Sequence, residues 1–273
     1  MAKYKGEISQ AAIDRKRKEG RGQGEGHSYL PWLTIHEVPS DGRAHQIAGW
    51  KTEGRDHQLL SDGELDCFYV FEWAKNVIDI REQYPLPLEA TLKIAESMGV
   101  KHPSHPTSKH PIIMTTDFLL TVQQGDQKFY HPWSFKYAKD LNVKSLRTAE
   151  KLEIERVYWN SIRHSPWSIV TELQRPTTLV RNVEIIHESI DLTHFNITSN
   201  AVDDISAWLS PRIQRQDIPL RDLASECDRS LGFIKSEVGT SLRVIYHLIA
   251  NRRWIIDMNS PIEPGNVLVV QNL

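Results

Sequence analysis

Cysteine is scarce in this chain, and long hydrophobic runs are missing. The 273 residues include two cysteines, Cys67 and Cys227, in helix-like apolar stretches 160 positions apart. That usage is typical of buried thiols and disfavours a disulfide framework or a zinc site. No apolar run approaches the roughly 18 residues that a membrane span needs, and the N-terminus lacks the apolar core of a secretory signal. We therefore expect a cytoplasmic protein that does not bind membranes.

Several enzyme signatures are also missing. The sequence has no Gly-x-Ser-x-Gly elbow, no His-Glu-x-x-His zinc helix and no dinucleotide-binding fingerprint. Glycines do alternate between Gly20 and Gly26, but this run follows no predicted strand and lacks the Gly-Lys-Ser/Thr ending of a P-loop. These absences disfavour serine hydrolases of that fold, zinc proteases, dehydrogenases and P-loop nucleotidases.

An excess of basic residues is lacking too. The chain carries 33 Lys and Arg against 35 Asp and Glu, a net charge of −2, so any nucleic-acid surface must be local. Residues 1–27 are the exception, with seven basic against four acidic residues. A short helix is predicted near residues 11–18, and we expect its basic side chains to lie along a DNA backbone; a solvated arm is the alternative. They are Arg15, Lys16, Arg17, Lys18 and Arg21.

At about 150 residues per domain, 273 residues correspond to roughly 1.8 domains, so we expect two domains. The hydrophobic content of 40% is enough for each domain to bury a core. Up to residue 170, strands predicted at 77–83, 112–122, 128–137 and 167–170 alternate with helices from 62, at 88–98 and at 145–163. Beyond it, helices are predicted at 202–214, 220–227 and 233–250, followed by extended pieces at 254–258 and 267–270. This second order is that of a winged helix-turn-helix, and we expect the boundary at residues 165–175.

A predicted hairpin gives the sharpest chemical signal. If its turn centres on Gly125 and Asp126, paired residues sum to about 251, which places Asp117 opposite Ser134. Lys136 is then a diagonal neighbour of Asp117. A carboxylate and an ammonium would thus project together from a mostly apolar sheet; a cross-strand salt bridge is the simpler interpretation.

Two further acids lie on apolar helical stripes. Glu64 shares a stripe with Phe68 and Phe71, and Glu155 lies between Leu152 and Trp159. Either could be structural, but a buried carboxylate needs a partner or a metal. Carboxylates that bind magnesium, beside one lysine, suit phosphodiester hydrolysis.

These residues resemble a known signature. Asp117, followed by Ser134-Phe135-Lys136 and preceded by the helical Glu64, resembles the PD-(D/E)xK restriction-endonuclease-like superfamily. A wider set of segments is more specific: Gly20–Gly24, Pro31–Thr34, Glu37–Ser40, Leu60–Asp62, Asp79–Gln83, Lys101–Pro103, Thr116–Leu119, Glu150–Glu153 and Tyr158-Trp159. With these segments, the chain over about residues 15–170 is similar to the TnsA endonuclease subunit of heteromeric cut-and-paste bacterial transposons.

The resemblance implies an α/β fold, a restriction-endonuclease-like mixed sheet flanked by helices, ahead of the α+β winged helix-turn-helix domain. The expected divisions are a basic Gly-rich arm at 1–27, a catalytic domain at 28–170 and a C-terminal domain at 171–273. The implied activity is metal-dependent cutting of the 5′ strands at transposon ends in a bacterial cytoplasm. The implied partners are transposon-end DNA, an RNase H-like transposase of the TnsB type, and an AAA+ regulator of the TnsC type that docks on the C-terminal domain.

By the same resemblance, Glu64 and Asp117 would bind Mg²⁺, with Mn²⁺ able to substitute. Lys136 would be the catalytic lysine, the Phe135 carbonyl a further ligand, and Glu155 an acid close to the site. Ser134 departs from the family pattern, which has Glu or Gln at that position. Because a hydroxyl is a poorer magnesium ligand than a carboxylate, we expect weaker metal binding than in relatives with Glu there.

Two other functions stay open at this point: a non-catalytic winged-helix adaptor with a degenerate nuclease domain, and a stand-alone restriction or repair nuclease. The helix predicted at 233–250 is open to two interpretations as well. Lys235 and Arg243 on it, with Arg252 and Arg253 beyond it, are candidate DNA contacts. The alternative, which its apolar character favours, is a packed helix.

Overall fold

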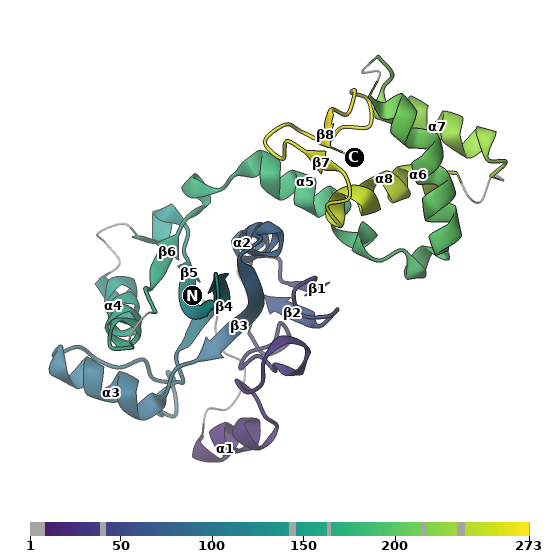
Figure 1. The fold of residues 1–273 in the computed structure, drawn as a ribbon. Helices are drawn as coiled ribbons and strands as arrows, with labels where there is room; N and C mark the ends of the chain where they lie inside the picture. Colours follow the sequence, from purple (N-terminus) through teal and green to yellow (C-terminus); the bar gives the residue numbers. More distant parts are fainter. Residues whose placement is uncertain are drawn as a thin grey trace. The chain divides into compact units, whose positions relative to one another are not determined.

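The computed structural model describes residues 9–38, 42–141, 146–162, 165–214, 217–233 and 238–272. The chain divides into two compact units, residues 1–175 and residues 176–273 (Figure 1). Among the helices in the described ranges, none has the long apolar run that a bilayer crossing needs.

A four-stranded mixed sheet organises the first unit. Its strand order is β3-β4-β5-β6, in which the first three strands are antiparallel and β6 runs parallel to β5. A separate antiparallel ribbon is formed by β1 and β2. The strands are β1 (His45–Ala48), β2 (Asp56–Leu59), β3 (Val77–Pro85), β4 (Thr115–Gln124), β5 (Gln127–Phe135) and β6 (Ser168–Val170).

Helices cover both faces of this sheet. Phe71 of α2 packs edge-on against Phe118 of β4, and Trp159 of α4 packs against the next residue, Leu119. Because successive strand residues point to opposite faces, α2 and α4 lie on opposite sides. The expected mixed sheet flanked by helices is confirmed. The helices are α1 (Gln10–Lys18), α2 (Asp62–Trp73), α3 (Leu88–Ser97) and α4 (Leu146–Asn160), with short 3-10 turns at Gly26–Ser28, Ala138–Leu141 and Glu172–Gln174.

The hairpin register is as predicted. Phe118 pairs with Trp133, and the remaining pairs of β4 and β5 keep the same sum of 251 around Gly125 and Asp126. Helix α2 begins at Asp62, where the sequence predicts it. Ser61 is its N-cap, because the Ser61 Oγ accepts a hydrogen bond from the Glu64 backbone N–H at 3.2 Å.

The second unit is mainly helical. In the part of this unit that the structure describes, the helices are α5 (Thr177–His187), α6 (Ser199–Ile213), α7 (Leu220–Ser230) and α8 (Thr240–Ala250), with 3-10 turns at Glu188–Ile190 and Thr193–Phe195. The chain ends in an antiparallel pair, β7 (Ile255–Ile256) and β8 (Val270–Asn272). Buried side chains from all four helices form its core: Val183, Ile186, Ile205, Leu209, Leu220, Leu223, Val244, Ile245 and Leu248.

Three expectations for this unit need correction. Helix α5 was missing from the prediction. Helix α8 begins at Thr240, not at residue 233, because Gly239 is left-handed with φ +92° and Asp228 accepts hydrogen bonds from the Gly239 and Ser241 backbones. Both extended pieces are shorter than expected. Within the described residues, the unit is therefore a helical domain with a short two-stranded sheet.

Candidate active site

Asp117 and Lys136 are in contact, as the hairpin register predicts. Asp117 Oδ2 accepts hydrogen bonds from Lys136 Nζ at 2.9 Å and from the Phe135 backbone N–H at 2.8 Å. Lys136 Nζ also donates to the Phe135 carbonyl at 2.6 Å. Burial disfavours the lysine's charge, but the ion pair with Asp117 outweighs it and raises the pKa of Lys136.

Glu64 reaches the same place from the first turn of α2. Its side chain accepts hydrogen bonds from the Leu60 backbone N–H at 2.9 Å, from Ser61 Oγ at 3.3 Å and from Gln83 Nε2 at 3.2 Å. Burial, together with the charge of Asp117, raises the pKa of Glu64 to about 8. The two carboxylates therefore act on one another electrostatically.

A glycine lets α2 approach the sheet this closely. A Cβ on Gly63 would lie 2.0 Å from the ring of Phe135, so any side chain there would push the helix off β5. Phe135 is itself held edge-on by Tyr137, with ring centroids 5.0 Å apart. The start of α2, and Glu64 with it, is thus set against the ends of β4 and β5.

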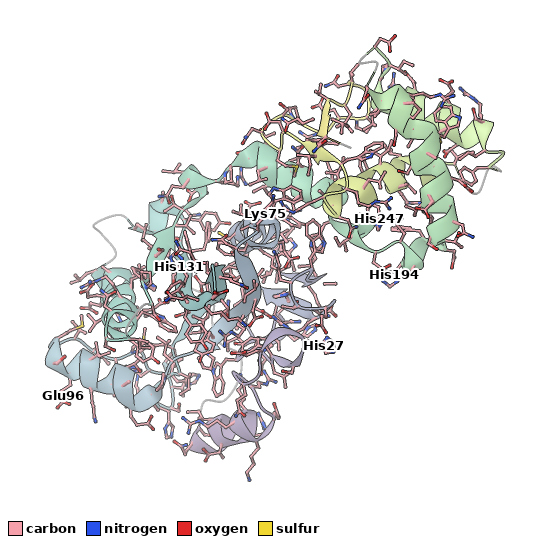
Figure 2. The ribbon with its side chains drawn as sticks, viewed as in Figure 1. His27, Lys75, Glu96, His131, His194 and His247 are labelled. Carbon is pink, nitrogen blue, oxygen red and sulfur yellow. The ribbon has the colours of Figure 1, made fainter. Side chains whose placement is uncertain are left out.

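Glu155 comes from α4 and is tied to two hydroxyls. Its Oε1 accepts hydrogen bonds from Ser134 Oγ at 2.6 Å and from Thr116 Oγ1 at 2.7 Å. The indoles of Trp159 and Trp167 donate to these same hydroxyls. Burial and the charge of Asp117 raise the pKa of Glu155 to about 7. His131, which lies in the same strand as Ser134, is labelled in Figure 2.

The donor set fits a hard divalent cation. Glu64 and Asp117 supply carboxylate oxygens and Phe135 a carbonyl oxygen, which are the ligands that Mg²⁺ prefers, with water completing its shell. In the structure the positively charged Lys136 ammonium donates hydrogen bonds to two of these groups, Asp117 and the Phe135 carbonyl. The two oxygens thus already face a common positive charge. Among the described residues, no three His, Cys, Asp or Glu side chains form a metal site by themselves.

Ser134 lies beside Glu155 and gives its hydroxyl hydrogen to that carboxylate. The five predicted site residues and Phe135 thus gather at the ends of two strands and on the facing helices.

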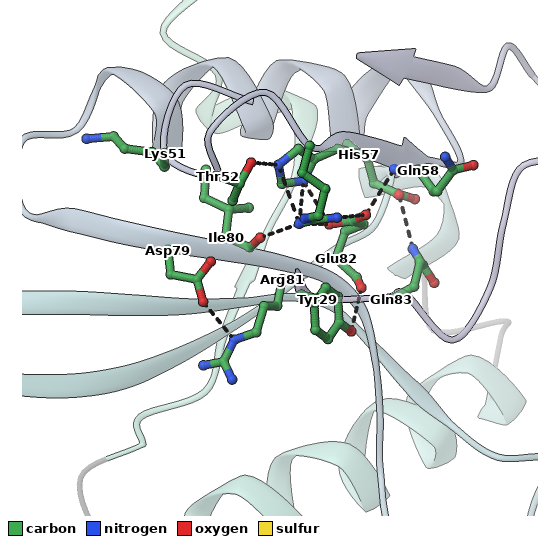
Figure 3. A network of polar contacts seen from close by, with 12 residues as sticks. Tyr29, Lys51, Thr52, His57, Gln58, Asp79, Ile80, Arg81, Glu82 and Gln83 are labelled. Carbon is green, nitrogen blue, oxygen red and sulfur yellow. Dashed lines mark hydrogen bonds and ion pairs between the residues drawn. The ribbon is translucent and has the colours of Figure 1, made fainter. Parts of the chain in front are cut away.

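Sequence reasoning missed Gln83 and the polar core beside it. Asp79, Arg81, Glu82 and Gln83 are all buried, although they lie in a strand of the central sheet. Figure 3 shows how closely these groups and their neighbours on β2 meet. The signal was available, because a run of charged residues in a predicted interior strand is costly unless every group is paired.

The N-terminal segment is packed against the first unit, and two of its basic residues are already paired. Lys16 is 4% exposed and forms an ion pair with Glu37 at 3.1 Å, and Arg21 reaches Glu37 at 2.6 Å. Because Lys16 is buried, the expectation that it lies along DNA is wrong, whereas the same expectation for the partly exposed Arg21 stays a prediction. Exposed basic side chains remain at Arg15, Arg17 and Lys18.

In the second unit, α8 buries most of its surface, in agreement with a packed helix. Arg243 lies over the ring of Phe195 at 4.4 Å, and Arg253 is 3.8 Å from Asp203. Lys235, the other contact predicted on the helix expected at 233–250, falls outside the described residues.

Comparisons with known proteins identify the family of this chain. The family model "TnsA-like endonuclease N terminal" matches residues 74–172, which include Asp117, Lys136 and Glu155, and "TnsA endonuclease C terminal" matches residues 176–258. The Escherichia coli protein "Transposon Tn7 transposition protein TnsA" is 42% identical over 187 residues, which is 68% of this chain and 66% of that protein. With both family models matched in order and this identity to a curated member, the chain belongs to the TnsA family.

Proposed function

We propose that this chain is a DNA endonuclease subunit of a heteromeric transposase, and that it makes metal-dependent cuts on the 5′ strands at transposon ends. One observation carries the proposal: Glu64, Asp117 and Lys136 converge at the ends of an antiparallel hairpin in a chain of the TnsA family. The relative's printed name describes a transposition protein, which supports the same process here.

Each residue has a chemical task in this proposal. Glu64, Asp117 and the Phe135 carbonyl would hold Mg²⁺, and Mn²⁺ could replace it. A metal held there would supply a water of lowered pKa and positive charge beside the phosphate. Lys136, held by Asp117, orients the attacking water and offsets the charge that develops on the phosphate.

Glu155 makes up for the carboxylate that Ser134 lacks. Ser134 occupies the strand position that carries Glu or Gln in the family pattern, and its hydroxyl holds the Glu155 carboxylate at 2.6 Å. This contact holds a carboxylate from α4 beside the Ser134 side chain. We expect Glu155 to contribute to metal binding through this contact, with Ser134 as its anchor.

The partners follow from the family. We propose that the first unit acts on transposon-end DNA beside an RNase H-like transposase of the TnsB type. Helices α6 to α8 with β7 and β8 would form a winged helix-turn-helix that docks on an AAA+ regulator of the TnsC type. The packed character of α8 supports protein docking over reading of the major groove.

The test is cleavage of transposon-end DNA by the full chain, with and without the partner transposase and with and without Mg²⁺. We expect cuts that need both, and Lys136→Met should lower their rate by about 10²–10³-fold, as loss of one charge-stabilising donor does. Cutting without the partner would indicate a stand-alone nuclease. Unchanged products with Lys136→Met would indicate a non-catalytic adaptor.

A further inference from the structure

One residue of β3 has an unusual backbone for a strand. Gln83 lies at φ +49°, in the left-handed region that residues other than glycine rarely adopt, yet it is 2% exposed in the central sheet. Its carbonyl accepts a hydrogen bond from the Trp32 backbone N–H at 3.2 Å. Strained residues of this kind persist where the surroundings hold them, and they concentrate at functional sites.

The side chain of Gln83 spans the gap between α2 and β4. Its Nε2 donates to Glu64 Oε2 at 3.2 Å, and its Oε1 accepts a hydrogen bond from Thr115 Oγ1 at 3.2 Å. With its oxygen taken by Thr115, the amide presents its N–H to Glu64. That contact fixes one of the two Glu64 carboxylate oxygens.

Glu82, the residue before Gln83, holds the segment that supplies the other hydrogen bond to Glu64 Oε2. Its buried carboxylate accepts hydrogen bonds from Arg55 at 2.8 and 2.9 Å, from His57 Nδ1 at 2.7 Å and from the Gln58 backbone N–H at 3.1 Å (Figure 3). These donors belong to the segment that leads through β2 to Leu60. Leu60 is the residue whose backbone N–H holds Glu64 Oε2.

Both donors to Glu64 Oε2 therefore depend on two neighbouring residues of β3. Glu82 fixes the segment that ends in the Leu60 N–H, and Gln83 supplies the amide. We propose that Gln83 is a positioning residue, which holds the Glu64 carboxylate in its metal-binding orientation through its amide. This inference rests on the proposed function, because it takes Glu64 to be a metal ligand.

Its test measures metal binding directly. The full chain is titrated with Mn²⁺, and free Mn²⁺ is followed by electron paramagnetic resonance without DNA. Gln83→Met keeps the length of the side chain and removes the amide, and we expect it to weaken Mn²⁺ binding by about 10–100-fold, the usual effect of losing a partner of a metal ligand. Thr115→Val, which frees the amide to turn, should weaken binding less but in the same direction.

Thr121→Val is the matched control. Thr121 is a buried β4 residue whose hydroxyl accepts a hydrogen bond from Arg81 at 3.1 Å, so its loss removes one buried hydrogen bond. We expect it to lower the melting temperature as Gln83→Met does and to leave Mn²⁺ binding unchanged. Equal losses of Mn²⁺ affinity in these two variants would overturn the inference, because a general loss of stability would then explain both.

Asp117→Ala separates this inference from the proposed function. If wild-type protein binds Mn²⁺, Asp117→Ala does not and Gln83→Met binds as tightly as wild type, the positioning role of Gln83 is wrong and the metal site stands. If Mn²⁺ affinity is the same in wild type and Asp117→Ala, the proposed metal site itself fails.

Discussion

Three carboxylates share one lysine at the candidate active site. Glu64, Asp117 and Glu155 all act electrostatically on Lys136. Burial and the charge of Asp117 raise the pKa of Glu64 to about 8 and the pKa of Glu155 to about 7. A divalent cation would restore the charge balance, which is the physical reason to expect metal binding here.

This imbalance predicts how stability depends on pH in metal-free protein. The folded-state pKa of Glu64, about 8, exceeds the ordinary value of 4.5, so between these values the folded state binds more protons than the unfolded chain. The free energy of unfolding should therefore fall as pH rises from about 4.5 to about 8. Thermal melts across this range check it. Glu64→Gln and added Mg²⁺ should each flatten the slope; a slope that neither changes contradicts the prediction.

Ser134 and Glu155 give a second prediction for single residues. If Glu155 supplies the missing carboxylate, Glu155→Gln should raise the Mg²⁺ concentration needed for half-maximal cleavage by about 10-fold or more. Ser134→Ala should raise it less, because Thr116 still donates to Glu155. Mg²⁺ titrations of cleavage by the full complex measure both. A larger effect from Ser134→Ala than from Glu155→Gln would show that Ser134 acts in another way.

At the scale of elements, the site depends on how closely α2 meets β5. Gly63→Ala would place a methyl group inside the Phe135 ring, and overpacking of this kind costs about 1–3 kcal/mol. We expect a lower melting temperature and slower cleavage, because Glu64 moves with the helix. Gly265→Ala is the control, since a Cβ there meets nothing within 4 Å. Full cleavage activity in Gly63→Ala would show that the close approach does not matter.

The exposed residues of α1 carry a further prediction. Arg15, Arg17 and Lys18 are exposed, whereas Lys16 pairs with Glu37 inside the unit. If the three exposed residues contact phosphates, replacing all of them with Ala should lessen the salt dependence of DNA binding by up to about 2.7 in log–log slope. Lys16 is kept so that α1 stays packed. An unchanged slope would remove α1 from the DNA interface.

Elements with a strong local signal could be predicted from the sequence, and the others could not. The turn at Gly125 and Asp126 fixes the hairpin register by simple counting, which brought Asp117 and Lys136 together correctly. The role of Gln83 could not be found in this way, because it depends on a left-handed backbone and on contacts with α2 and β4. Helix α5 was missed although its apolar residues recur at helical spacing.

At the scale of the whole molecule, the two units suit different tasks. The first unit carries every residue of the candidate active site, and the second matches the separate C-terminal model of the family. Asp117 and Lys136 are partly exposed and paired with each other, so on the proposed function DNA and metal would have to reach this pair. On the same proposal, the partner transposase would deliver the transposon end to this site.

The most direct test maps the cut strand. Transposon-end DNA labelled separately on each strand is incubated with Mg²⁺, the partner transposase and either wild-type chain or Asp117→Ala. The account predicts 5′-strand cuts with wild type that disappear with Asp117→Ala, while the 3′-strand cuts of the partner remain. Persistent 5′-strand cuts with Asp117→Ala would contradict it, because the cutting would then come from another site.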